Sequence, residues 1–267
     1  IKQPETVNMN SSMQQLRWRV VGASVCGTSH IRNSQLCQDA HHWQMLPDNI
    51  LVAAAADGAG SASLGKVGAM VAVEAAIENI SLKQINRDTL DKDNSAKSLL
   101  SEAILAAKTA VEEEAIASNR PPKDLATTLI IVVATPVVAV VAQIGDGVAV
   151  AKDSMGNLTA LTVPDSGEYI NETNFLTSPT ALDSVQVNVW RQGITNIALL
   201  TDGLQMLAIN MSVGLPHKPF FLPLFEFVAN AQELKGAKEQ LVKFLRSEKI
   251  TQRTDDDLTL IIAALSD

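Results

Sequence analysis

The sequence has 267 residues, of which 46% are hydrophobic and 19% charged, so it can bury a large core and is not a disordered chain. Its formal net charge of −8, without a cluster of lysine and arginine residues, excludes a surface that binds the nucleic-acid backbone. Two cysteines exclude a disulfide scaffold, and the longest apolar stretch, residues 129–144, is interrupted by proline and glutamine and is not a membrane span.

The N-terminal half begins with a polar tail, residues 1–15, which lacks the apolar core of a signal peptide, and we therefore expect a cytoplasmic location. Partial alternation of apolar and polar residues predicts a strand at 18–25, and a short apolar run predicts a second strand at 50–56. Apolar residues at helical spacing predict helices at 63–80 and 95–119.

The C-terminal half is rich in strands. The predicted strands lie at 127–135, 137–144, 148–152, 158–162, 185–191, 194–201 and 258–265, and predicted helices at 218–231 and 233–247. We expect the four strands between residues 127 and 162 to form an antiparallel meander. In the first predicted helix, Gly65 and Gly68 are expected to allow close contact with a sheet. Runs of strands beside paired helices indicate the α+β class, and the absence of repeats or composition shifts predicts one domain over residues 16–267.

Four aspartates share one local context, because each lies where an apolar strand stops at Asp-Gly or starts from Asp. They are Asp57, Asp146, Asp202 and Asp256. A single aspartate at such a place is usually a turn former, but four in one domain favour a site for Mg²⁺ or Mn²⁺, which prefer oxygen ligands. The four histidines form no zinc-binding pattern, so a histidine-rich zinc centre is disfavoured.

Six short motifs carry a family resemblance. In chain order they are Gln38-Asp39, Ala56-Asp57-Gly58-Ala59-Gly60, Ala126-Thr127-Thr128, Gly145-Asp146-Gly147, Thr201-Asp202-Gly203 and Asp256-Asp257-Leu258-Thr259. Each is weak alone, but their order and their places at strand ends resemble the metal-dependent protein phosphatase 2C (PPM) family over residues 18–265, in a short bacterial-like form without a large flap.

The resemblance implies a β-sandwich of two antiparallel sheets flanked by pairs of antiparallel helices. It also implies a phosphoserine/phosphothreonine protein phosphatase that uses two Mn²⁺ or Mg²⁺ ions and a bridging hydroxide, without a phosphoenzyme. By this resemblance Asp57 bridges the ions, the Gly58 carbonyl binds one of them, and Asp39 orients the water. The remaining ligands would be Asp202 and Asp256, with Asp146 helping Asp202 to hold a weaker third ion.

Three positions depart from the family pattern. Gln38 stands where an acidic residue is common, which predicts a higher Mn²⁺ requirement. Ala59 replaces the histidine that protonates the leaving oxygen in eukaryotic relatives, so either a metal-bound water or His30 would supply the proton. The nearest arginine for binding phosphate is Arg32, which lies two residues further from the motif aspartate than usual.

Two alternatives to the enzyme remain open at this point. A regulatory module could keep the fold and bind a phosphoprotein with little or no turnover, as Gln38 and Ala59 suggest. An aspartate-nucleophile phosphohydrolase would need a second aspartate at position 59. For the enzyme we expect a phosphoprotein substrate, a partner serine/threonine kinase, a monomeric state, and a mobile substrate-selecting loop at 164–179.

Overall fold

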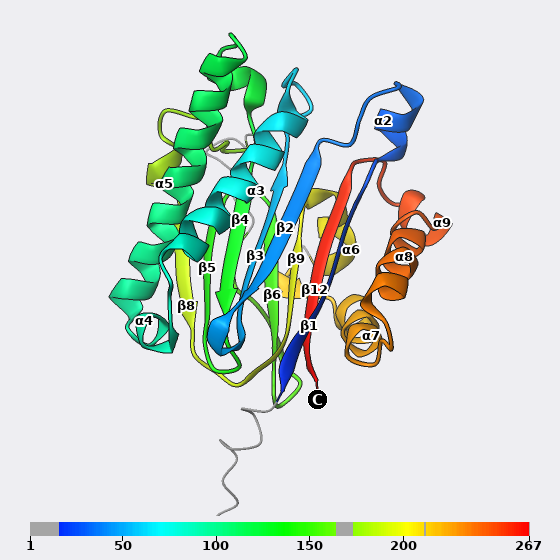
Figure 1. The fold of residues 1–267 in the computed structure, drawn as a ribbon. Coiled ribbons are helices and arrows are strands. Elements are labelled where there is room, and N and C mark those ends of the chain that lie inside the picture. The colour runs from blue at the N-terminus through cyan, green and yellow to red at the C-terminus, as the bar shows by residue number, and fades with distance from the viewer. Residues whose placement is uncertain (1–15, 164–172, 211, 267) are drawn as a thin grey trace, which may run out of the picture.

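The computed structural model describes residues 16–163, 173–210 and 212–266, which form two antiparallel sheets packed face to face (Figure 1). The first five-stranded sheet has the spatial order β1 (Arg17–Val25), β12 (Leu258–Ser266), β9 (Ile194–Leu200), β6 (Val148–Asp153) and β7 (Leu158–Ala160). The second has the order β2 (Asp39–Leu46), β3 (Ile50–Asp57), β4 (Leu129–Ala134), β5 (Ala139–Ile144) and β8 (Gln186–Trp190). The predicted α+β sandwich is confirmed.

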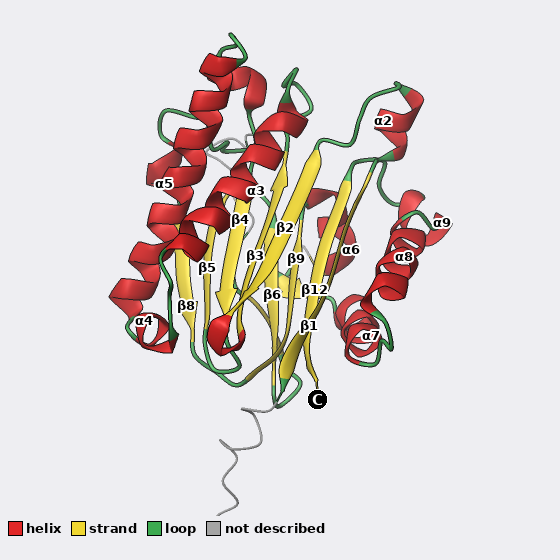
Figure 2. Cartoon of the chain, in the orientation of Figure 1, coloured by secondary structure: helices red, strands yellow, loops and turns green. Residues whose placement is uncertain are grey.

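A pair of helices covers the outer face of each sheet (Figure 2). The second sheet carries α3 (Gly65–Leu82) and α5 (Asp93–Ala117), and the first carries α7 (Lys218–Ala229) and α8 (Leu234–Leu245). Shorter elements are α2 (Thr28–Arg32), α4 (Arg87–Asp91), α6 (Gln205–Ala208), α9 (Glu248–Thr251), β10 (Ile209–Asn210) and β11 (Leu215–Pro216). Across the described ranges no helix has the length and hydrophobicity needed to cross a bilayer.

Three apolar layers hold these elements together, one between the sheets and one beneath each helix pair. Strand β3 shows how one sequence serves two layers: Leu51 and Ala53 point between the sheets, whereas Val52 and Ala54 point toward α3 and α5. A strand buried on both faces needs apolar side chains on both, which explains its unbroken apolar run.

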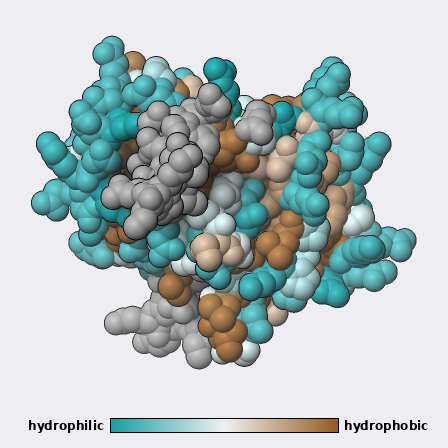
Figure 3. All heavy atoms as spheres, turned by 90° about the horizontal axis from the view of Figure 1, so that it is seen from below, coloured by the Kyte–Doolittle hydropathy of each residue, from teal (hydrophilic) through white to brown (hydrophobic). Residues whose placement is uncertain are grey.

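Seen from below, hydrophilic residues gather at the two sides of the molecule and hydrophobic residues lie mainly between them (Figure 3).

The contact between α3 and the segments that follow β3 and precede β4 depends on glycine. A Cβ atom added at Gly68 would lie 2.1 Å from the Leu125 carbonyl oxygen, and one added at Gly65 would lie 3.1 Å from the Ala59 carbonyl oxygen. The two glycines do make close contacts, but with the segments that flank β3 and β4 rather than with a strand of the sheet as expected. This packing matters for function because α3 follows directly on the loop that starts at Asp57.

Replacing Gly68 with alanine is expected to lower the free energy of unfolding by about 1–3 kcal/mol, since the backbone atom it meets cannot move aside cheaply. A matched control is Gly236→Ala in α8, where an added Cβ meets nothing within 4 Å. That change should leave stability unchanged or raise it by about 0.5–1 kcal/mol. Urea unfolding of both variants measures the difference, and equal stability of the two would contradict this packing argument.

Strand β2 is the main element that the sequence pattern misses. It pairs with β3 in antiparallel register, with Asp39 opposite Asp57, and it forms an edge of the second sheet. Its outer positions carry exposed polar side chains such as His42 and Gln44, so it lacks the apolar run that marks the other strands. The edge position tolerates this composition because one face meets solvent.

The predicted meander over residues 127–162 is wrong in one respect. β4 and β5 form a hairpin in the second sheet, but β6 and β7 pair in the first sheet, so the chain crosses the sandwich after Ile144. Gly145, with φ of 97°, makes this crossing in a conformation that favours glycine. The polar tail at 1–15 and the part of the predicted substrate loop at 164–172 lie outside the described residues.

Candidate active site

The predicted site aspartates lie near one another at one end of the sandwich, although they are far apart in the sequence. Asp39 begins β2 and Asp57 ends β3, and the two are direct register partners. Asp202 follows the end of β9, and Asp256 precedes the start of β12, which pairs with β9. Asp146 lies at the crossing from β5 to β6, beside the start of β6, which also pairs with β9.

The motif threonines hold the backbone around Asp57. Thr128 Oγ1 accepts a hydrogen bond of 3.0 Å from the Asp57 N–H, and Thr127 Oγ1 donates one of 2.9 Å to the Asp57 carbonyl. Gly58 then packs so tightly that an added Cβ would lie 2.3 Å from the carbonyl carbon of Gly65. A carboxylate and a backbone carbonyl are thereby fixed side by side at a rigid strand end.

Asp39 is held by hydroxyl groups rather than by basic residues. Thr201 Oγ1 donates a 2.7 Å hydrogen bond to Asp39 Oδ2, and accepts one of 3.0 Å from the Thr259 N–H. The other oxygen, Asp39 Oδ1, is buried without a hydrogen-bond partner in the described part of the chain, and so is Gln38 Oε1 beside it. Unpartnered buried oxygens are costly, so these atoms need a donor or a cation.

Negative charge concentrates at this end of the sandwich. Burial raises the pKa of Asp39 to about 7, and burial followed by the charges of Asp39 and Asp202 raises the pKa of Asp57 well above its usual range. Burial, then Asp146 and Asp256, raises the pKa of Asp202 to about 7. Burial, together with the repulsion that acts on Asp57 and Asp202, is the physical reason for a cation, because a bound ion favours the charged forms of these carboxyls.

The donor set fits hard divalent ions. Every proposed ligand atom is an oxygen, from the side chains of Asp57, Asp202, Asp256 and Asp146 and from the Gly58 carbonyl, which is the set that Mg²⁺ and Mn²⁺ prefer. Asp256 is exposed, whereas Asp202 is half-buried. Asp146 also accepts a 2.8 Å hydrogen bond from Thr173 Oγ1.

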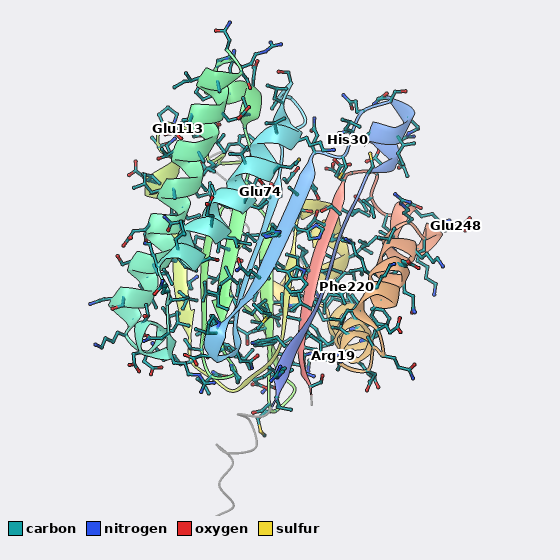
Figure 4. The ribbon with its side chains drawn as sticks, in the orientation of Figure 1. Arg19, His30, Glu74, Glu113, Phe220 and Glu248 are labelled. Carbon is teal, nitrogen blue, oxygen red and sulfur yellow. The ribbon has the colours of Figure 1, made fainter. Side chains whose placement is uncertain are left out.

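The two basic candidates have different surroundings. Arg32 is exposed, donates 3.1 Å hydrogen bonds to the Thr28 carbonyl and to Asp255 Oδ2, and forms an ion pair with the latter. His30 is mostly buried, with Nδ1 2.8 Å from Asp257 Oδ2. Figure 4 shows His30 on the side of α2 that faces the strand ends.

Cys37 is excluded as a nucleophile. Burial, then the charges of Asp39 and Asp257, raises the pKa of its thiol far above the usual range, so it stays protonated.

Sequence reasoning missed the roles of three residues that the fold brings to this site. Thr201 and Thr128 bind the motif aspartates, and Asp257 binds the segment before Asp39. All three belong to the six motifs of the sequence analysis, so the residues themselves were visible in the sequence. Their roles depend on contacts across the sandwich, which spacing along the chain does not reveal.

An acidic oxygen cluster at the end of an α-β-β-α sandwich is the arrangement of a metal-dependent phosphatase, and comparison with known proteins agrees. A family model described as protein phosphatase 2C matches residues 26–246, and the serine/threonine-protein phosphatase 3 of Escherichia coli is 37% identical over 254 residues, covering 93% of this chain and 98% of that protein. The chain belongs to the protein phosphatase 2C family.

Solved structures show the same fold at low sequence identity. A serine/threonine phosphatase from Staphylococcus aureus aligns with a TM-score of 0.61 at 15% identity, covering 92% of this chain and 94% of that one. The catalytic domain of the phosphatase PstP in complex with two manganese ions aligns with a TM-score of 0.62 at 16% identity, covering 95% of this chain and 100% of that one.

Proposed function

We propose that this protein hydrolyses phosphoserine and phosphothreonine in proteins with the help of two Mn²⁺ or Mg²⁺ ions. The observation that carries the proposal is the group of carboxyls at strand ends, Asp39, Asp57 and Asp202. Burial raises the pKa of all three, and the charges of neighbouring carboxylates add to the rise at Asp57 and Asp202. The E. coli relative named above, a serine/threonine-protein phosphatase, supports the choice of substrate.

The proposed roles of the ligands are those that the family resemblance implies. Asp57 and the Gly58 carbonyl would hold the ions at the end of β3, with Asp202 and Asp256 completing the set from β9 and β12; Asp146 would add a weaker third site. Bound ions lower the pKa of water and neutralise charge on the phosphoryl oxygens.

The remaining steps belong to side chains of this protein. Asp39 orients the attacking water through Oδ1, which is buried without a hydrogen-bond partner in the described part of the chain, and takes up its proton. Water attacks phosphorus directly, so no residue carries the phosphoryl group. Ala59 offers no proton donor to the departing oxygen, so either water at the site or His30 would supply the proton.

Arg32 would bind a phosphate oxygen of the substrate. Its present partner Asp255 is 65% exposed, and such surface ion pairs contribute only about 0–1 kcal/mol. The guanidinium can therefore exchange Asp255 for a phosphate at small cost. A cytoplasmic location, a monomeric state and a partner serine/threonine kinase complete the proposal.

A metal titration of phosphothreonine-peptide hydrolysis tests the function and the ligand assignment together. Wild type should be inactive after chelation and recover with Mn²⁺ at a higher concentration than enzymes with an acidic residue in place of Gln38, because a neutral amide adds no charge. Asp256→Asn should need still more Mn²⁺, by about 10–100-fold, and have a lower kcat. Full activity in chelator would refute the mechanism, and inactivity at every metal concentration would favour the regulatory-module alternative.

A further inference from the structure

The side chain of Asp257 is buried beside the proposed ligand Asp256, and its carboxylate contacts the connection between β1 and β2. Its carboxylate lies within 2.8 Å of three nitrogen atoms: the Gly27 N–H at 2.6 Å, the Gln38 N–H at 2.5 Å and His30 Nδ1 at 2.8 Å. All three belong to the connection between β1 and β2, more than 200 residues away in the sequence. One carboxylate thus joins the start of β12 to α2 and to the residue before Asp39.

The contacts fix the protonation of the His30 ring. A carboxylate can only accept hydrogen bonds, so the bond to Asp257 Oδ2 places a proton on His30 Nδ1. The second nitrogen, Nε2, is then the atom that can carry or give up the exchangeable proton. This is the way in which an aspartate orients a histidine in acid–base catalysis.

Helix α2 and the residue before it pack against the segment that carries Asp256. Ser29 donates hydrogen bonds of 2.9 Å and 2.6 Å to the Asp255 carbonyl through its N–H and its Oγ. Gly27 lies so close that an added Cβ would be 2.2 Å from the carbonyl carbon of Asp256. His30 therefore has little freedom to move relative to the proposed metal ligands.

The other three histidines are poorly placed for the same task. His41 lies within β2, bonded through Nδ1 to Ser24 Oγ at 2.7 Å, and burial lowers its pKa to about 4. His42 is exposed further along β2, and His217 directly precedes α7, in the helix pair that α7 forms with α8. Only His30 is held beside an aspartate that adjoins a proposed ligand.

We propose that Asp257 is a positioning residue, which orients His30 so that its imidazolium protonates the departing serine or threonine oxygen. The inference rests on the proposed phosphatase function. In the reaction the P–O bond to the substrate oxygen breaks and a bond from the water oxygen to phosphorus forms. Asp39 takes one proton from that water, His30 gives one to the leaving oxygen, and exchange with solvent restores both groups.

The test compares two substrates that differ in their need for an acid. The leaving group of a phosphothreonine peptide is a basic alkoxide, which needs a proton. The leaving group of p-nitrophenyl phosphate is a stable phenolate, which needs none. His30→Gln should lower kcat on the peptide by about 10²-fold, the scale of general acid catalysis, and change kcat on p-nitrophenyl phosphate little. Asp257→Asn should shift the ratio of the two kcat values in the same direction, by about 10-fold. The exposed His42→Gln serves as the matched control and should leave the ratio unchanged.

Non-additivity separates positioning from general support of the fold. If Asp257 acts through His30, the double variant should have the same kcat ratio as His30→Gln alone. Equal losses on both substrates in Asp257→Asn, or full peptide activity in His30→Gln, would overturn the proposal. If Asp257→Asn does not fold, recovery of peptide hydrolysis by added imidazole in His30→Ala gives the answer, and absence of recovery counts against the acid role. A wild-type enzyme without Mn²⁺-dependent activity would instead refute the function itself.

Discussion

Replacing Asp57 with asparagine is expected to lower kcat for phosphothreonine-peptide hydrolysis by about 10³-fold or more, beyond the 10²–10³-fold that loss of a single charge-stabilising group costs. Asp57 lies at the centre of the carboxylate group, where both Asp39 and Asp202 raise its pKa. This position supports the proposal that Asp57 would hold both ions. Steady-state kinetics at saturating Mn²⁺ measure the loss.

The same substitution should make the metal-free protein more stable, because it removes one of several mutually repelling charges and keeps the size of the side chain. Thermal unfolding in chelator tests this second expectation. Asp91→Asn, an exposed position in α4, is the matched control and should change neither activity nor stability. An Asp57→Asn enzyme with more than a tenth of wild-type kcat would contradict its assignment as the bridging ligand.

Removal of the metal is expected to have the second largest effect, and the effect should depend on pH. Asp39 and Asp202 have folded pKa values of about 7, raised from the usual value of 3.8, so the folded protein binds more protons than the unfolded chain. Stability of the metal-free protein should then fall as pH rises through 7. Buried His41, whose pKa is lowered to about 4, acts in the opposite direction only below about pH 6.5.

The measurement is thermal unfolding at pH 6.5 and pH 8, in chelator and in Mn²⁺. In chelator the melting temperature should be lower at pH 8. Mn²⁺ at about 100 times its Kd should restore about 2.7 kcal/mol at pH 8, which corresponds to roughly 5–10 °C for a domain of this size. A smaller gain is expected at pH 6.5, where protons compete with the ion. A metal-free protein that becomes more stable toward pH 8 would contradict the charge-repulsion argument.

The two helix pairs and most strands could be predicted from the sequence because their apolar residues recur at the spacing of a helix or a strand. The unbroken apolar run of β3 and the helical spacing in α5 depend on neighbours along the chain, and their bounds lie within two residues of the prediction. Strand β2 could not be predicted, since what makes it a strand is its register with β3 rather than its own composition.

The place where the chain crosses from one sheet to the other could not be predicted from the sequence either. Four strands in a row favour a meander by their turns alone, and local turn chemistry does not state in which sheet the next strand will pair. The crossing at Gly145 matters for the site, because it brings Asp146 beside the end of β9 and therefore near Asp202.

By itself the sequence determined which residues are acidic and which strands end at them, and hence the prediction of an aspartate site for hard cations. Those features are local, since each motif consists of a strand end and its turn. Only the tertiary structure decided that Thr201 holds Asp39 and that Asp257 holds His30 and Gln38, because these contacts join segments more than 150 residues apart. The carboxylates gain their raised pKa values only when folding buries them together, so the electrostatic demand for a metal is a property of the fold rather than of any one motif.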